Sequence, residues 1–327
     1  MTYRKLGKTN LRVSEISLGT WQLGGKWGDP YNHASAEKIV HDAIDQGINF
    51  IDTADVYNDG LSEQTIGKVL KNRSEEVYVA TKCGRQLQPH INESYQPAVL
   101  RRFVEDSLKR LQLKTIDLVQ LHCPPTEVYY RPEIFELFDR LKEEGKIQYM
   151  GVSVEKVEEA LKAIEFDNVT TVQIIFNMFR HRPSDLFFEQ AAKKDVGIIA
   201  RVPLASGLLT GKYSASTVFG EGDHRNFNRD GAAFDKGETF SGVPYETGLQ
   251  VVDELAELFG RENLSKAALK WILSFKEVSC VIPGASRPEQ VFQNLKALNF
   301  PNLSGAQLDR VKKIYDRDVK PFVHHLW

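Results

Sequence analysis

Short apolar segments alternate with longer amphipathic segments along this chain of 327 residues. The short segments, such as Asp117–His122, are nearly continuous in apolar residues, which is typical of parallel strands buried on both faces. The longer segments, such as Ser35–Gln46, repeat apolar residues at helical spacing. An N-terminal hairpin is expected over Arg4–Val13, and eight strand–helix units follow it. The expected strands are Glu15–Gly19, Asn49–Asp52, Val77–Lys82, Asp117–His122, Tyr149–Ser153, Thr171–Phe176, Gly197–Val202 and Ser279–Ile282, and the expected helices are Ser35–Gln46, Ser62–Leu70 with Ser62 as N-cap, Pro97–Leu111, Pro132–Glu144, Glu155–Ile164, Pro183–Lys194, Tyr245–Phe259, Ser265–Phe275 and Pro288–Leu298.

Eight such units in a chain of this length predict a (β/α)8 TIM barrel with an N-terminal β-hairpin. The stretch Tyr213–Val243, after the seventh strand, is too long for a simple connection, so we expect a loop over the barrel mouth. The segment after Leu303 is expected to form a C-terminal helical cover. Length alone would allow two domains, but no linker divides the units, and a single domain over residues 1–327 is predicted.

Composition narrows the functional classes. A formal net charge of −2 gives no reason to expect a nucleic acid or an anionic membrane surface as a partner. Cys83, Cys123 and Cys280 are widely spaced and form no CxxC motif, which predicts a reduced, cytoplasmic protein without a metal site. No signal peptide or membrane-spanning run is recognisable. Nothing marks an obligate interface, so a monomer or weak oligomer is expected.

Candidate chemistry comes from four polar residues, each at or just beyond the end of an apolar run. Asp52, Lys82 and His122 end the second, third and fourth strands, and Tyr57 follows Asp52 by five residues. Active sites of this fold gather at the carboxyl ends of the strands, so these side chains should meet at the barrel mouth. Lys82 would then lower the pKa of Tyr57, and Asp52 would keep Lys82 charged. Tyr57 could act as general acid or base, with His122 orienting a carbonyl oxygen.

Each of these residues alone also has a structural interpretation. A strand-end Asp or Lys is often part of an ion pair, and the histidine of Leu-His-Cys-Pro could be a hydrogen-bonded core residue. The combination of an acid, a phenol, an amine and an imidazole at adjacent strand ends favours catalysis over this interpretation.

An ordered set of motifs accompanies these residues over nearly the whole chain, and with them the chain resembles an aldo-keto reductase, close to the bacterial group of sugar- and inositol-related reductases. The motifs are Leu-Gly-Thr-Trp at Leu18–Trp21, Phe-Ile-Asp-Thr-Ala-Asp-Val-Tyr at Phe50–Tyr57, Ala-Thr-Lys at Ala80–Lys82, Leu-His-Cys-Pro at Leu121–Pro124, Gly-Val-Ser at Gly151–Ser153, Pro-Leu-Ala-Ser-Gly-Leu-Leu-Thr-Gly-Lys at Pro203–Lys212 and Val-Ile-Pro-Gly-Ala at Val281–Ala285.

The resemblance implies a nicotinamide cofactor, NADPH/NADP+ with NADH as an alternative, bound across the barrel mouth. Ser153 and Gln173 would then contact the carboxamide, Gly19 and Thr20 would line the nicotinamide, and Arg201 would stack on it. The loop that wraps the pyrophosphate would comprise Leu204, Ser206, Gly207, Leu208, Gly211 and Lys212, and the adenosine end would be bound by Gly284, Ala285, Ser286, Arg287, Gln290 and Asn294.

Three positions depart from the pattern of the family. Residue 154 is Val where Asn is usual, Arg201 stands where an aromatic residue is frequent, and Ser286 replaces a basic residue. Arg287 alone is left to favour a 2′-phosphate, so NADPH is preferred with dual use of NADH as the alternative.

The substrate is predicted to be a small-molecule carbonyl compound or the corresponding alcohol, bound by Trp21, Trp27 and Cys123. The alternatives are a sugar or polyol dehydrogenase that works mainly in oxidation, and a cofactor-binding regulatory subunit with little turnover. The intact set of Asp52, Tyr57, Lys82 and His122 argues against the regulatory role.

Overall fold

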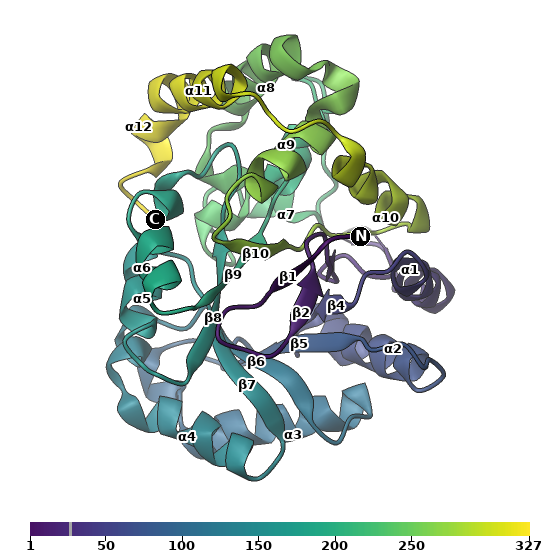
Figure 1. Ribbon diagram of the computed structural model, residues 1–327, viewed down its shortest axis with the longest axis vertical. Coiled ribbons are helices and arrows are strands. Elements are labelled where there is room, and N and C mark those ends of the chain that lie inside the picture. Colours follow the sequence, from purple (N-terminus) through teal and green to yellow (C-terminus); the bar gives the residue numbers. More distant parts are fainter. Residues whose placement is uncertain (26–27) are drawn as a thin grey trace.

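Eight parallel strands, β3 to β10, form one sheet in sequence order in the computed structural model, which describes residues 1–25 and 28–327 (Figure 1). The sheet closes between its first and last strands. Ser17 N donates to Val281 O over 2.9 Å, and Gly19 N donates to Pro283 O over 3.1 Å. The predicted (β/α)8 barrel is therefore confirmed. The strands are β3 Leu18–Gly19, β4 Phe50–Asp52, β5 Tyr78–Cys83, β6 Ile116–His122, β7 Ile147–Ser153, β8 Val169–Ile175, β9 Gly197–Arg201 and β10 Val278–Val281.

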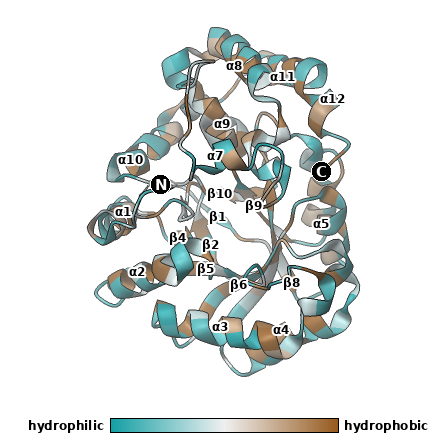
Figure 2. Cartoon of the chain, turned by 180° about the vertical axis from the view of Figure 1, so that it is seen from behind, coloured by the Kyte–Doolittle hydropathy of each residue, from teal (hydrophilic) through white to brown (hydrophobic). Residues whose placement is uncertain are grey.

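Amphipathic helices surround the sheet, with hydrophobic faces toward the strands and hydrophilic faces outward (Figure 2). The first helix, α1, begins after Asn32, whose side chain accepts a hydrogen bond from the Ser35 amide over 2.9 Å and so acts as the N-cap. The prediction of Ser62 as an N-cap is wrong. Left-handed residues Asn58 and Asp59 redirect the chain, and Gly60 is the cap. The helices are α1 His33–Asp45, α2 Leu61–Leu70, α3 Pro97–Leu111, α4 Pro132–Glu143, α5 Val157–Ala163, α6 Phe187–Lys193, α8 Tyr245–Phe259, α9 Leu264–Leu273 and α10 Pro288–Leu295.

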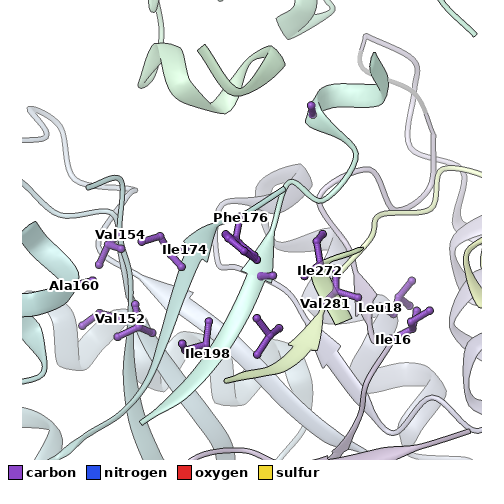
Figure 3. Packing of buried hydrophobic residues seen from close by; sticks show 14 of the residues in the cluster. Ile16, Leu18, Val152, Val154, Ala160, Ile174, Phe176, Ile198, Ile272 and Val281 are labelled. Atoms are coloured by element: carbon purple, nitrogen blue, oxygen red, sulfur yellow. The ribbon is translucent and has the colours of Figure 1, made fainter. Parts of the chain in front are cut away.

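Alternation along the strands divides the core into two parts. Outward-facing residues such as Val152, Ile174 and Ile198 pack against the helices (Figure 3). Inward-facing residues form a second cluster, which the hairpin of β1 (Tyr3–Lys5) and β2 (Arg12–Ser14) closes at the amino ends of the strands. The inner cluster comprises Leu6, Leu11, Val13, Phe50, Ala80, Leu118, Ile199, Cys280 and Ile282. Because strands have a period of two, the next inward position on each strand begins the layer that holds the candidate site.

Two covers lie at the mouth of the barrel, as the sequence predicts. The stretch 213–243 is more ordered than a plain loop, because it contains α7 (His224–Phe227) and two 3-10 turns. Arg180 joins the covers. Its Nη2 donates to Ser241 O over 3.2 Å, and its Cζ lies 4.1 Å from the ring centroid of Trp327.

The C-terminal cover that ends at Trp327 consists of α11 (Gly305–Ile314), a π-helical turn and α12 (Lys320–Val323). Among the helices of the described residues, none combines the length and apolar content needed to span a membrane.

The hairpin seals the barrel through a close backbone approach at Gly7. Gly7 has φ +55, and a Cβ there would lie 2.1 Å from Gly197 N. Gly145 has φ +71 but open space around its Cβ position. Gly145→Ala should therefore lower the free energy of unfolding by about 1–2 kcal/mol through backbone strain. Gly7→Ala should cost about 1–3 kcal/mol more because of the clash. Urea unfolding measures both, and equal losses would contradict this account of the seal.

Candidate active site

Adjacent strand ends bring the four predicted catalytic residues together. Asp52, Lys82 and His122 lie at the carboxyl ends of β4, β5 and β6. Tyr57 returns to them from a 3-10 turn that follows β4, where its amide donates to Ala54 O over 3.1 Å. The five residues from Asp52 to Tyr57 therefore span the end of β4 and one tight turn, which brings the Tyr57 side chain back to the strand ends.

Lys82 is the centre of the hydrogen-bond network. Its Nζ donates to Asp52 Oδ2 over 2.6 Å, to Thr53 O over 2.8 Å and to the Tyr57 hydroxyl over 3.1 Å. The side chain of Lys82 is 1% exposed. An ammonium has three donors, so the network uses all of them and fixes the Tyr57 oxygen relative to the strands.

Two glutamines donate the remaining hydrogen bonds that the Asp52 carboxylate accepts from side chains. Gln173 Nε2 donates to Asp52 Oδ1 over 2.7 Å, and Gln120 Nε2 donates to the same oxygen over 3.2 Å. The resemblance assigned Gln173 to the cofactor, and here its amide nitrogen positions the carboxylate. Gln120 was missed by the sequence analysis. The signal was present, because Gln120 lies two residues before His122 and so faces the same side of β6.

Burial and charge set the protonation of this group. Burial raises the pKa of Tyr57 above its usual value, although the Lys82 ammonium acts in the opposite direction. The expectation of a lowered Tyr57 pKa is therefore wrong, because the loss of hydration outweighs the charge. Burial disfavours the ammonium of Lys82 and is the largest single influence, but Asp52 and Tyr57 together outweigh it and raise the pKa of Lys82. The network thus holds a neutral phenol beside a charged amine.

His122 faces Tyr57, with ring centroids 6.0 Å apart and the rings nearly perpendicular. Burial lowers the pKa of His122 well below its usual value, and the positive charges of Arg85, Lys82 and Arg201 act in the same direction. Its Nδ1 is buried without a partner among the described residues. The imidazole is therefore neutral near pH 7.

A cluster of four charged residues flanks this centre. Arg85 Nη1 donates to Glu238 Oε1 over 2.9 Å, and Arg201 Nη2 donates to Glu155 Oε2 over 2.8 Å. Arg201 Nη1 also lies 3.7 Å from Glu238 Oε1. Glu238 belongs to the cover 213–243, so the cluster ties this cover to the barrel mouth. Arg85, Glu155 and Glu238 were missed by the sequence analysis, which lacked any short-range signal for them.

Ligand atoms of Cys123, Glu155 and Glu238 lie within 4.8 Å of one another, a grouping that could hold a metal ion. The guanidiniums of Arg85 and Arg201 already pair with both carboxylates. Burial also raises the pKa of the Cys123 thiol, which disfavours the thiolate that metals bind. The grouping is accordingly an ion-pair cluster.

The segment after β9, predicted to wrap a pyrophosphate, has unusual backbone geometry. Val202, Ala205 and Ser206 all have positive φ, between 47° and 55°. A β-branched residue such as Val rarely adopts this conformation, and such strain is concentrated at ligand-binding segments. Ser206 Oγ donates to Glu238 O over 3.0 Å and so contacts the cover.

Other residues predicted for the same segment differ in exposure. Leu208 is buried at 1% exposure, so only its backbone could meet a ligand, whereas Lys212 is exposed. The remaining predicted members of the segment, Leu204, Gly207 and Gly211, lie beside them, Gly207 and Gly211 with positive φ.

At the predicted adenosine end, Gln290 organises the start of α10. Its Oε1 accepts from Ser286 N over 2.7 Å and from Arg287 N over 3.2 Å. Asn294 Nδ2 donates to Gly284 O over 3.3 Å. Arg287 is exposed, Ser286 and Ala285 are buried, and the position of a Cβ on Gly284 has its nearest neighbour at 3.9 Å.

The remaining predicted residues line the mouth between β3 and β7. Thr20 donates to Asp52 O from its amide N over 3.0 Å and from Oγ1 over 2.9 Å. The backbone of Gly19 lies so close to Ile282 O that a Cβ added to Gly19 would be 2.7 Å from that oxygen. Ser153 lies beside Cys123, with Oγ and Sγ 3.5 Å apart.

Of the predicted substrate residues, Trp21 lies under the cover, its ring centroid 5.0 Å from that of His224 and 6.0 Å from that of Phe234. Cys123 is buried next to Ser153. Trp27, the third predicted substrate residue, lies outside the described residues.

Asp55 is an ionisable residue behind the site. It is 1% exposed, and neither carboxyl oxygen has a hydrogen-bond partner among the described residues. Burial raises the pKa of Asp55 to about 8, and the nearby Glu63 adds to the effect. Asp55 is therefore protonated at neutral pH.

Comparison with known proteins adds an independent observation. A sequence model described as the Aldo/keto reductase family matches residues 15–316. Aldo-keto reductase YhdN of Bacillus subtilis is 32% identical over 299 residues, covering 89% of this chain and 87% of the relative. The NADH-specific methylglyoxal reductase of Escherichia coli is 30% identical, covering 94% and 97%. Among solved structures, the glycerol dehydrogenase AKR11B4 from Gluconobacter oxydans is 30% identical with a TM-score of 0.76, covering 97% and 96%.

Asp55 predicts an unusual dependence of stability on pH. Its pKa is about 8 in the folded protein and about 3.9 in an unfolded chain. The folded state therefore binds the extra proton between these values, and its contribution to stability is lost as the pH rises through 8. Asp55→Asn should remove this loss, which amounts to up to about 1.4 kcal/mol per pH unit. Urea unfolding at pH 5, 7 and 9 should show the variant gaining on the wild type as pH rises, and parallel curves would contradict the assignment.

Proposed function

Because the chain belongs to the aldo/keto reductase family, we propose that it transfers hydride between NADP(H) and an aldehyde or ketone, or the corresponding alcohol. The observation that carries the proposal is the contact of the Lys82 ammonium with both Asp52 and the Tyr57 hydroxyl, 2.6 and 3.1 Å away. A phenol held by a charged amine at a barrel mouth is equipped to donate a proton to a carbonyl oxygen.

Tyr57 is the general acid in this proposal. Its raised pKa keeps the phenol protonated, so it can give its proton to the oxygen as negative charge develops there. Lys82 then stabilises the phenolate, and Asp52 keeps Lys82 charged and oriented. His122, neutral and nearly perpendicular to Tyr57, donates a hydrogen bond to the same oxygen. In alcohol oxidation the same residues act in reverse.

The nicotinamide cofactor would supply the hydride. Several features of the mouth fit such a group. The left-handed segment around Ser206 and the exposed Lys212 offer backbone amides and a cation to a pyrophosphate. Gly284 leaves open space beside the exposed Arg287, which suits the adenosine end. Ser153 and Gln173, paired in register on β7 and β8, would meet the carboxamide.

Gln173, Arg201, Gly19 and Thr20 are four of the residues proposed to contact the nicotinamide. Gln173 keeps its carbonyl oxygen for this role while its nitrogen holds Asp52. Arg201, held by Glu155 and by Val154 O over 3.0 Å, would present the face of its guanidinium to the ring. Gly19 and Thr20 would line the opposite side.

NADPH is the proposed cofactor because Arg287 places an exposed cation at this end. NADH is the alternative, since Ser286 offers no charge and one relative is an NADH-specific methylglyoxal reductase. Oxidation of a polyol is the alternative direction, since a structural neighbour is a glycerol dehydrogenase. Buried, unpaired cysteines are consistent with action in the cytoplasm.

Tyr57→Phe tests the mechanism. It removes the transferable proton but leaves the ring, so kcat for reduction of an aldehyde such as 4-nitrobenzaldehyde should fall by at least about 100-fold. Affinity for NADPH should stay within a factor of two, because Tyr57 bonds to Lys82. Stopped-flow measurement of NADPH consumption and fluorescence titration of the cofactor check both parts. Retention of full turnover would exclude Tyr57 as the acid, and unchanged biological activity without turnover would favour a regulatory subunit.

Arg287→Gln tests the cofactor preference. Loss of a charge-assisted contact to a 2′-phosphate should raise the Kd for NADPH by about 10-fold or more and leave the Kd for NADH unchanged. Lys212→Gln is the matched control, because a contact to the pyrophosphate is common to both cofactors and its loss should weaken both. Quenching of tryptophan fluorescence gives each Kd. Equal weakening of both cofactors by Arg287→Gln would refute the assignment of the 2′-phosphate contact.

A further inference from the structure

Arg85 extends from the connection after β5 into the barrel mouth. It follows Lys82 by three residues and contacts two residues of the cover 213–243. Its Nη1 donates to Glu238 Oε1 over 2.9 Å, and its Cζ lies 5.6 Å from the ring centroid of Phe234. These contacts fix the guanidinium from one side, while 21% of the side chain stays exposed.

The other edge of this guanidinium is unused. Among the described residues, Nε and Nη2 of Arg85 have no hydrogen-bond acceptor, and neither is one of the buried polar atoms that lack a partner. These atoms are therefore open to solvent. The Nε and Nη2 donors of an arginine point in parallel and match the two oxygens of a carboxylate or phosphate. Arg85 thus presents a fork for an anion while its opposite side is anchored.

Arg85 acts directly on the reaction centre. Burial is the largest influence that lowers the pKa of His122, and the positive charge of Arg85 is the second largest. An anion held by the free edge would accordingly lie within electrostatic range of the group that meets the carbonyl oxygen.

Charged groups of both signs lie around the mouth. Arg85 and Arg201 face Glu238 and Glu155, and Lys82 is balanced by Asp52. Burial raises the pKa of Glu155 above its usual value, whereas the guanidiniums of Arg85 and Arg201 hold the pKa of Glu238 below its usual value, so Glu155 is the carboxyl of the cluster that binds a proton more readily. When Glu155 is protonated, two guanidiniums face one carboxylate, and one positive charge is left in excess at the mouth.

We propose that the site takes carbonyl compounds that also carry an anionic oxygen group, a carboxylate or a phosphate, and that the Nε–Nη2 edge of Arg85 binds this group. Arg85 is then a specificity-determining residue, which orients the substrate so that its carbonyl oxygen meets Tyr57 and His122. The inference rests on the proposed reductase function and names the substrate class of the same site.

The experiment compares substrates that differ in one charge. 4-Formylbenzoate and methyl 4-formylbenzoate have similar shape, and the ester group withdraws electrons more strongly and so favours reduction of its own aldehyde. A higher kcat/KM for the acid therefore reports recognition of the carboxylate. The wild type should prefer the acid by about 10- to 100-fold, the range of one charge-assisted contact. Glycolaldehyde phosphate against glycolaldehyde gives the same ratio for phosphate, and the larger ratio identifies the anion.

Three variants assign the effect to Arg85. Arg85→Gln should abolish the preference. Glu238→Gln removes a negative charge beside Arg85 but keeps an amide oxygen that can accept from Nη1, so it should increase the preference. Arg140→Gln, an exposed residue of α4, changes net charge by the same amount and should leave the ratio as in the wild type. If Arg85 serves only to hold the cover, Arg85→Gln will lower kcat/KM for both aldehydes equally, and the proposal is wrong.

A binding measurement keeps the test independent of turnover. Calorimetry of benzoate and benzamide with the NADP+-loaded protein should show tighter binding of benzoate, and Arg85→Gln should remove the difference. If neither aldehyde is reduced but benzoate still binds through Arg85, the proposed reaction fails and the anion site stands. If both aldehydes are reduced alike and benzoate binds no better than benzamide, the anion site fails and the reductase stands.

Discussion

The ion pair of Asp52 and Lys82 is the constraint on which the rest of the site depends. Both side chains are almost fully buried, at 3% and 1% exposure. Burying two charges costs several kcal/mol per ion unless every hydrogen-bonding group is satisfied. Here Lys82 uses all three donors, and Asp52 receives further hydrogen bonds from Gln120 and Gln173. Removing Asp52 or Lys82 would leave an uncompensated charge, and removing either glutamine would take a hydrogen bond from the buried carboxylate. The network thus joins strands β4, β5, β6 and β8 at their carboxyl ends.

This polar layer explains why the barrel has two different ends. Below it, the hairpin and inward-facing residues such as Phe50 and Leu118 form an apolar plug. Above it, the mouth contains charges and a strained connecting segment. The plug excludes water from the lower face of the ion pair, which strengthens the electrostatic coupling of Lys82 to Tyr57. Adjacent layers of the same strands thus supply stability and reactivity. The two layers are two positions apart along each strand, as Phe50 and Asp52 are on β4.

Sequence periodicity was sufficient to predict the strands and α8, because each follows from a local pattern. The parallel order of the strands in a barrel was then sufficient to predict that Asp52, Tyr57, Lys82 and His122 lie together. It failed where geometry is not local. Ser62 has the residue type of an N-cap, but left-handed Asn58 and Asp59 move the helix start to Gly60.

The sequence analysis also took the sign of the Tyr57 shift from the Lys82 charge alone, whereas burial is the larger effect. The contact of Arg85 with Glu238 joins residues 153 positions apart, and no motif links them.

The cover 213–243 is therefore better regarded as a wall of the site than as a simple lid. Its backbone is held by Arg180, which also packs on Trp327, and its Glu238 is 5% exposed between two guanidiniums. Moving the cover would separate these opposite charges in a region of low dielectric, which costs more than breaking an exposed ion pair. A ligand that brings its own negative charge lowers this cost, because it replaces part of the field that Glu238 supplies. If the substrate carries an anion as proposed, its charge and the position of the cover would be coupled through the same arginines.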